Sequence, residues 1–163
     1  MRRKLFTSLL FAPVFLALAS TAVASTTWYV NGVSGGNSNN CLSPTTACKT
    51  IKHAISLAAS ADTIMVAAAI YQENLTIGKS LTILGSGAPS TIIDGGGVGR
   101  VVTISNGPHV TLSKLTIRNG RANPGGGINN SGTLTLTAPS VGIGHLSHVS
   151  TILCSAKLAP ARR

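Results

Sequence analysis

The strongest constraint on this chain is a short triplet, threonine between two aliphatic residues, that recurs from Glu73 to Gly120 with Gly, Ser, Asn or Pro between copies. In an extended strand, such alternation places the aliphatic side chains on one face and the threonine on the other. The pattern therefore predicts a succession of very short strands. The expected pairs on the apolar faces are Leu75 and Ile77, Leu81 and Ile83, Val102 and Ile104, and Leu115 and Ile117.

The strands also recur in a fixed order at a nearly constant period. We match residues 63–66 with 91–94 about 28 residues later, 74–77 with 101–104 about 27 later, and 81–83 with part of 110–117 about 29 later; a third turn starts near residue 125. Three strands repeating in order predict a solenoid with three parallel sheets, and parallel connections take the right hand. The predicted fold is all-β, a right-handed parallel β-helix of about three turns. An antiparallel sandwich explains the alternation but not the recurring order.

A short helix and several glycines are expected to shape the ends and corners of the coil. The apolar residues of segment 50–60 have helical spacing, which predicts an amphipathic helix that caps the first turn, with His53 as a solvated residue. The corner glycines are expected to supply positive φ angles; they are Gly78, Gly85, Gly95 and Gly107.

The first 24 residues have the pattern of a secretory signal peptide. A basic start at residues 1–4 precedes an apolar run over residues 5–18, and Ala22-Val23-Ala24 is a small-residue cleavage site. A membrane anchor is the alternative, but the run is shorter than the roughly 20 residues of a spanning helix. We predict a secreted or cell-surface protein with no transmembrane segment once the signal is removed.

The charge of the chain is basic but dispersed. The formal net charge is +10, yet part of it lies in the signal peptide and in the tail. Between residues 25 and 137, seven basic side chains are scattered among strands and turns without a companion cluster of aromatics. This distribution excludes nucleic acid as the expected partner.

Cys41 and Cys48 flank a turn that contains a proline, and an exported chain meets oxidising conditions. A local disulfide is predicted, with two unpaired thiols as the alternative. A metal site is not predicted, because no histidine or second cysteine pair stands at ligand spacing. Cys154 is then left without an assigned partner.

Seven segments of the chain together carry a recognisable pattern; they are residues 28–31, 41–48, 49–51, 62–64, 71–74, 90–95 and 115–120. They resemble the N-terminal part of bacterial secreted right-handed parallel β-helix repeat proteins of the pectin-lyase-like superfamily. The resemblance covers Thr27 to about Thr137 and is specific for the fold but weak for activity. One departure is Ala69-Ile70, where the family has Gly-Thr.

The period is lost after Ala138, where the family pattern would lead into another rung. We interpret this as a frame slip or premature end after about residue 137, and the alternative is a divergent cap in which residues 150–153 form a last strand. The expected organisation is a signal peptide at 1–24, an N-terminal strand, disulfide loop and helix at 25–62, β-helix turns at 63–137, and an atypical or disordered tail at 138–163. An uncovered last turn predicts self-association.

Members of this superfamily that cleave polysaccharides need carboxylates: the resemblance implies an acidic, calcium-holding cluster with a base in a lyase, or two carboxyl groups in a hydrolase. The whole chain has three acids, Asp62, Glu73 and Asp94. No catalytic residue is predicted; Asp94, Arg100 and Arg118 are the least poor candidates. The alternative role of Asp94 is to bind backbone amides of its glycine turn. No cofactor is expected, and calcium only in a lyase.

The predicted function is therefore an exported, non-catalytic β-helix module for surface structure, adhesion, or the binding of carbohydrate or protein. The alternative is a truncated fragment of a polysaccharide lyase or glycoside hydrolase.

Overall fold

Short parallel strands coil about one axis in the computed structural model of the chain, which describes residues 24–122, 126–137, 147–149 and 152–155. The predicted signal peptide and most of the predicted tail lie outside these residues. In the part of the chain that the structure describes, no helix is long and apolar enough to cross a membrane.

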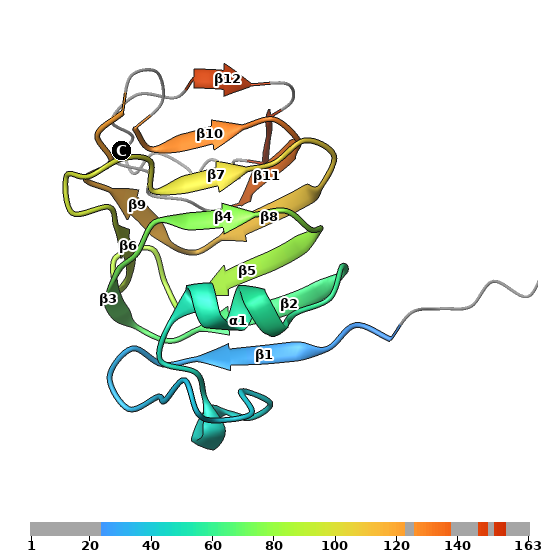
Figure 1. Cartoon of the computed structure of the whole chain (residues 1–163), viewed down its shortest axis with the longest axis vertical. Helices are drawn as coiled ribbons and strands as arrows, with labels where there is room; N and C mark the ends of the chain where they lie inside the picture. The colour runs from blue at the N-terminus through green and yellow to red at the C-terminus, as the bar shows by residue number, and fades with distance from the viewer. Residues whose placement is uncertain (1–23, 123–125, 138–146, 150–151, 156–163) are drawn as a thin grey trace, which may run out of the picture.

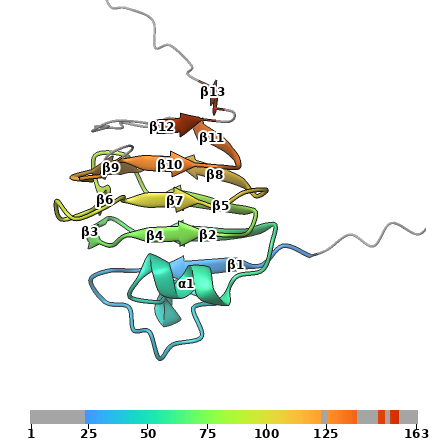
Figure 2. The ribbon, with the colours of Figure 1, turned by 45° about the horizontal axis from the view of Figure 1, so that its top comes forward.

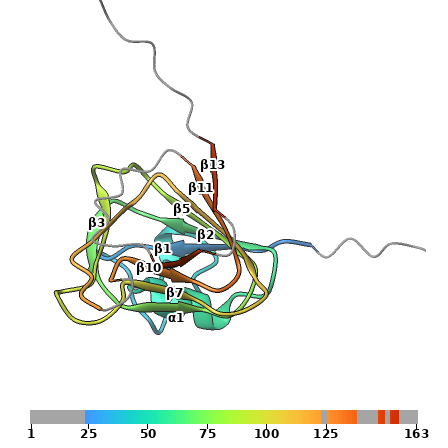
Figure 3. The same ribbon diagram turned by 90° about the horizontal axis from the view of Figure 1, so that it is seen from above.

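Each turn of the coil contributes one strand to each of three sheets (Figures 1 and 3). The first turn consists of β2 (Asp62–Val66), β3 (Ala69–Gln72) and β4 (Leu75–Ile77). The second consists of β5 (Leu81–Gly85), β6 (Thr91–Asp94) and β7 (Val102–Ile104). The third consists of β8 (His109–Ser113), β9 (Thr116–Arg118) and β10 (Ile128–Asn130), and β11 (Thr133–Thr137), β12 (Ser147–Val149) and β13 (Ile152–Ser155) follow.

All pairs of neighbouring strands in the three sheets are parallel. We call the six-stranded sheet, in the order β1-β2-β5-β8-β11-β13, sheet A. Sheet B is β3-β6-β9, and sheet C is β12-β10-β7-β4. The parallel β-helix predicted from the recurring triplets is thus confirmed. Strands β12 and β13 lie within the segment predicted as the tail, and they extend sheets C and A.

One part of the predicted repeat alignment is wrong. Thr63 pairs with Thr82, not with Thr91, and residues 91–94 instead stack on β3. The predicted matches of Leu75 with Val102 and of Leu81 with Val110 are confirmed. Every strand has the same alternation, so a strand can be matched at a similar period with a strand of a different sheet. Only the backbone hydrogen bonds between strands identify the strand that lies beside it in the next turn.

The interior is built from columns of aliphatic side chains that stack from turn to turn. In sheet A, Ile64, Ile83, Leu112 and Leu136 stand in register and are each at most 4% exposed. In sheet C, Ile77 lies in register with Ile104, and both are fully buried. Each strand is too short to bury its own apolar face, so its burial depends on the turns above and below.

The N-terminal end of the coil is closed by β1 (Thr27–Val30), the loop that follows it, and α1 (Ile51–Leu57) (Figure 2). Strand β1 pairs with β2 at the edge of sheet A, and α1 packs against β1, β2 and β4. Helix α1 begins after the N-cap Thr50, whose side chain accepts a hydrogen bond from His53 N–H. The predicted capping helix is confirmed, within slightly shorter bounds than 50–60.

The loop after β1 covers the outer edge of that strand. Tyr29 N–H donates to the Cys41 carbonyl, and Tyr29 O accepts from Cys48 N–H, both at 2.8 Å. Within the loop, the 3-10 helix η1 (Pro44–Thr46) is capped by Ser43, whose side chain accepts from Thr46 N–H. These bonds satisfy backbone groups that would otherwise offer an open edge for pairing with another chain.

The hydroxyl of Tyr71 holds the first corner of the coil in place. Tyr71 Oη donates to the Ala67 carbonyl at 2.9 Å and accepts from Gly32 N–H at 3.1 Å. Burial raises the pKa of this hydroxyl against the opposing effect of the Gly32 hydrogen bond. The corner is thereby joined to the loop after β1.

The four corner glycines differ in what requires them. Gly107 has the predicted positive φ, 107°, but Gly78, Gly85 and Gly95 do not. At Gly85 a Cβ atom would collide with the carbonyl oxygen of Lys114 in the next turn. The close approach of successive turns therefore requires glycine there.

Replacing Ile104 by alanine should lower the free energy of unfolding by about 2–5 kcal/mol, because it opens a cavity between turns. Thr103→Val is the matched control, since it changes the outward neighbour and keeps a β-branched residue, and it should change stability by less than about 1 kcal/mol. Urea unfolding followed by circular dichroism measures both. Equal losses in the two variants would contradict the assigned inward and outward faces.

Candidate functional site

The three carboxylates were the first candidates for chemistry, and each one is engaged in holding the fold. Asp62 Oδ1 accepts from Thr26 N–H at 2.8 Å, and Asp62 Oδ2 accepts from Trp28 Nε1–H and Ala59 N–H, both at 2.8 Å. Burial opposes ionisation, but these hydrogen bonds and the charge of Lys79 outweigh it, so the pKa of Asp62 lies below its usual value. Asp62 thus joins β1, the end of the helical segment and β2.

Glu73 closes the start of α1. Its two carboxylate oxygens accept from the N–H groups of Ile51 and Lys52, at 2.9 and 2.8 Å. These N–H groups have no partner inside the helix, and a negative charge is favourable at a helix N-terminus. Glu73 therefore fastens the capping helix to the first turn.

Asp94 holds the glycine turn that follows β6. Asp94 Oδ1 accepts from Gly96 N–H at 2.9 Å, and Oδ2 accepts from Arg118 Nε–H at 2.8 Å and from Asn119 Nδ2–H at 2.9 Å. The Gly96 and Arg118 hydrogen bonds lower the pKa of Asp94, with burial opposing them. The structure thus brings Asp94 and Arg118 together, as an ion pair between successive turns.

The third candidate, Arg100, contributes its backbone to the same region, where its carbonyl accepts from Asn74 Nδ2–H at 2.6 Å. The backbones of Glu73 and Asp94 are adjacent, because Glu73 N–H donates to the Asp94 carbonyl at 3.1 Å. Their carboxylates, however, serve different partners, one on α1 and one on the third turn. Each of the three carboxylates therefore links two segments of the chain by hydrogen bonds.

An open groove on the outer face of sheet A is a candidate for ligand binding. Its volume is about 420 Å³. Three side chains of sheet A that stand in register on adjacent strands line the groove: Tyr29, Met65 and Leu84. Pro44 and Asn31 of the N-terminal loop and the corner residues Ser86 and Lys114 also line it.

Lys114 carries the positive charge among the described residues that line the groove. Its φ is +52°, a left-handed conformation that is uncommon for residues other than glycine. Its N–H donates to the Thr137 carbonyl at 3.2 Å. Cys41, Ala61 and Asn119 also have positive φ, so this conformation reflects the corner that Lys114 occupies. The sequence analysis did not single out Lys114. The feature that could have identified it is its position in a two-residue corner between two strands.

A column of threonines runs beside the groove on the same face. It crosses five adjacent strands in register, and every member is partly exposed. With strands about 4.8 Å apart, the hydroxyls form a regular row of donors and acceptors. The members are Thr27, Thr63, Thr82, Thr111 and Thr135.

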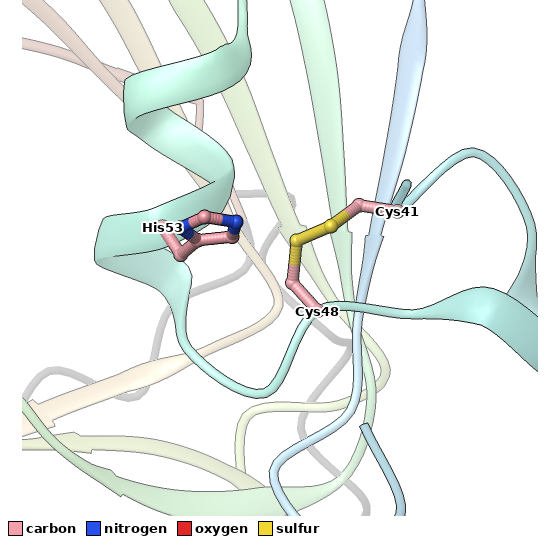
Figure 4. A group of neighbouring side chains, drawn as sticks. All are labelled: Cys41, Cys48 and His53. Atoms are coloured by element: carbon pink, nitrogen blue, oxygen red, sulfur yellow. A yellow bond between two sulfur atoms is a disulfide. The ribbon is translucent and has the colours of Figure 1, made fainter. Parts of the chain in front are cut away.

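The predicted disulfide between Cys41 and Cys48 is confirmed, with their Cα atoms 5.0 Å apart. His53, predicted as a solvated helix residue, is partly buried and turns its imidazole toward the disulfide (Figure 4). The three possible ligand atoms, two sulfurs and one ring nitrogen, lie within 4.8 Å of one another. Linear spacing did not reveal this neighbourhood, because α1 turns back toward the loop.

No model of a protein family and no curated protein sequence matches the chain. Among solved structures, the chain is similar to the pectin methylesterase PemA from Erwinia chrysanthemi, with a TM-score of 0.54 and 20% sequence identity. The match covers 81% of this chain and 46% of that chain, so this chain spans less than half the length of its neighbour. At this identity the likeness concerns the fold, and it agrees with the parallel β-helix built from the residues.

The lowered pKa values of Asp62 and Asp94 predict a loss of stability in acid. Both carboxylates stabilise the fold above their unfolded pKa, about 3.9, and this contribution is lost as the pH falls through that value toward the folded pKa. The free energy of unfolding, from urea titrations, should therefore be lower at pH 3 than at pH 6.

Asp94→Asn removes one of the two titrations and should show a smaller difference between pH 6 and pH 3 than the parent. Arg121→Gln, at an exposed position of the same corner, should keep the parental difference. A parent protein equally stable at both pH values would contradict the roles given to these carboxylates.

Proposed function

We propose that this protein is an exported, non-catalytic β-helix module that binds acidic polysaccharide through the outer face of sheet A, as a surface or adhesion component. The observation that carries the proposal is the groove in which Lys114 stands at the end of an apolar floor formed by Tyr29, Met65 and Leu84.

The groove offers the three kinds of contact that a uronate polymer needs. The ring of Tyr29 gives a flat apolar surface for a sugar face, and aromatic side chains bury such area with little loss of conformational entropy. Lys114 supplies a cation for a carboxylate. Asn31 and Ser86 add polar groups at the margin. Ligand sites commonly combine an apolar lining with a few placed polar groups in this way.

The threonine column extends the same surface along the axis of the coil. Its hydroxyls can donate to and accept from sugar hydroxyls, and they repeat at the strand spacing of about 4.8 Å. A polymer lying along the column would meet equivalent groups on successive turns. Repetition of weak contacts raises the overall affinity without any strong single contact.

Two further observations support export and the polymer class. The disulfide of Cys41 and Cys48 is of the kind found in oxidising compartments. The structural neighbour is titled a pectin methylesterase, which makes pectin-type polymers the first probes to use. Our proposal also includes a bacterial source, as the resemblance found in the sequence implies.

Lys114→Asn should weaken binding of polygalacturonate by about two- to fivefold, the range of a single partly exposed ion pair. Asparagine tolerates the left-handed backbone, so the change removes the charge without straining the corner. Isothermal titration calorimetry at low salt measures the affinity. Lys114→Arg, which keeps the charge, should retain most of the binding.

Lys52→Gln is the matched control for charge, since it removes one positive charge at an exposed position of α1. It should leave the affinity nearly unchanged. If Lys52→Gln and Lys114→Asn weaken binding equally, the effect comes from net charge and the groove is not the site. Tyr29→Leu tests the aromatic floor independently, because it should weaken binding without changing charge.

A second candidate function is a fragment of an enzyme that acts on polysaccharide. Its basis is the partial match to a structure titled a pectin methylesterase, an enzyme of ester hydrolysis rather than of chain cleavage. We expect no cleavage, because Asp62, Glu73 and Asp94 are all engaged in internal hydrogen bonds. Incubation of the purified chain with polygalacturonate and calcium should release neither unsaturated nor reducing ends. Release of either, abolished by Asp94→Asn, would establish the enzyme instead.

A further inference from the structure

Cys41, Cys48 and His53 form a compact donor set at the N-terminal end of the coil (Figure 4). The three ligand atoms lie within 4.8 Å of one another. Tetrahedral zinc, with bonds of about 2.0–2.3 Å, needs its ligand atoms about 3.5–3.8 Å apart. Once the sulfur–sulfur bond is broken, side-chain rotation alone can supply displacements of this size. We propose that the reduced form of this protein binds a thiophilic divalent cation, zinc, through Cys41, Cys48 and His53.

The backbone around this set is held by bonds that do not depend on the disulfide. Cys41 N–H donates to the Thr46 carbonyl at 2.9 Å, and the Cys41 carbonyl accepts from β1. Cys48 lies beside Val30 in a parallel bridge, and its carbonyl accepts from Asn31 N–H at 2.8 Å. Reduction therefore leaves both cysteines attached to β1 by backbone hydrogen bonds.

The position of His53 also does not depend on the disulfide. It stands in the first turn of α1, where its N–H donates to the Thr50 hydroxyl and where Glu73 binds the two preceding N–H groups. A donor set already assembled in the folded chain loses little entropy on binding a cation, which is the advantage of a preorganised site.

The chemistry of the donors selects the cation. Two thiolates and one imidazole suit soft or borderline metals, and zinc sites with three protein ligands keep a fourth position for water. Two thiolates also neutralise a divalent cation. Both cysteines are fully buried, so a complex without net charge is the form that this position can hold at least cost.

The conversion between the two forms balances as a two-electron reduction. A dithiol or phosphine reductant supplies two electrons, and with two protons the disulfide becomes two thiols while the reductant is oxidised. Binding of one divalent cation then forms two metal–sulfur bonds and releases the two thiol protons. Oxidation of the thiols back to the disulfide releases the cation, so disulfide and metal compete for the same sulfur atoms.

The test uses the full mature chain with Cys154→Ser, so that the two loop cysteines supply the thiols. The protein, reduced with a phosphine, is titrated with zinc in competition with a chromophoric chelator. We expect one equivalent of zinc on the reduced protein and none on the oxidised protein. His53→Gln should lower the affinity at least about tenfold, since loss of even an outer-shell partner costs about 10–100-fold. His109→Gln, an exposed position on β8, should bind like the parent.

Circular dichroism keeps the result interpretable if reduction loosens the fold. Reduced protein should keep its β-sheet spectrum, or regain it when zinc is added, because binding and folding are then coupled. Zinc should also slow the return of the disulfide in air in the parent and not in His53→Gln. Three results would each overturn the proposal. They are equal zinc binding by the oxidised and reduced proteins, unchanged zinc binding in His53→Gln, and a reduced protein that neither binds zinc nor refolds with it. These outcomes are independent of polysaccharide binding.

Discussion

The structure depends on the stacking of aliphatic side chains from one turn to the next inside the coil. Ile64, Ile83, Leu112 and Leu136 form one such column, in register along sheet A. Each strand alone is too short to bury an apolar face. Backbone hydrogen bonds between parallel strands fix the register, and the register brings aliphatic groups of neighbouring turns into contact. Cooperation between these two interactions makes each turn stable only in the presence of its neighbours.

A stack of this kind must be closed at its end and held together between turns, and the three carboxylates serve these two purposes. Asp62 joins β1 to the first turn, and Glu73 joins α1 to it. Asp94 links the second turn to the third through Arg118. Each acid accepts hydrogen bonds from its own protein, so all three carboxylates hold the framework together. This distribution directs attention to the outer faces as the places for function.

The outer face of sheet A has two columns with different character. The threonine column is uniform from β1 to β11, whereas the column beside it changes from Tyr29, Met65 and Leu84 to Ser113 and Thr137. The apolar half of that second column, with the N-terminal loop beside it, makes the groove. The disulfide that shapes this loop also stands next to His53, so the proposed polymer site and the proposed cation site lie in two parts of the same end of the molecule.

By itself, the sequence determined the coil, its inward residues, the capping helix and the disulfide, because these follow from local alternation, helical spacing and chain proximity. Only the tertiary structure decided which strands are neighbours, since Thr63 matches Thr82 and Thr91 equally well by pattern. The roles of Asp94 with Arg118, of Lys114 at the groove, and of His53 beside the disulfide were likewise decided in three dimensions. The physical reason is that a short strand specifies its faces locally, whereas corner geometry and the backbone ladder select its partners.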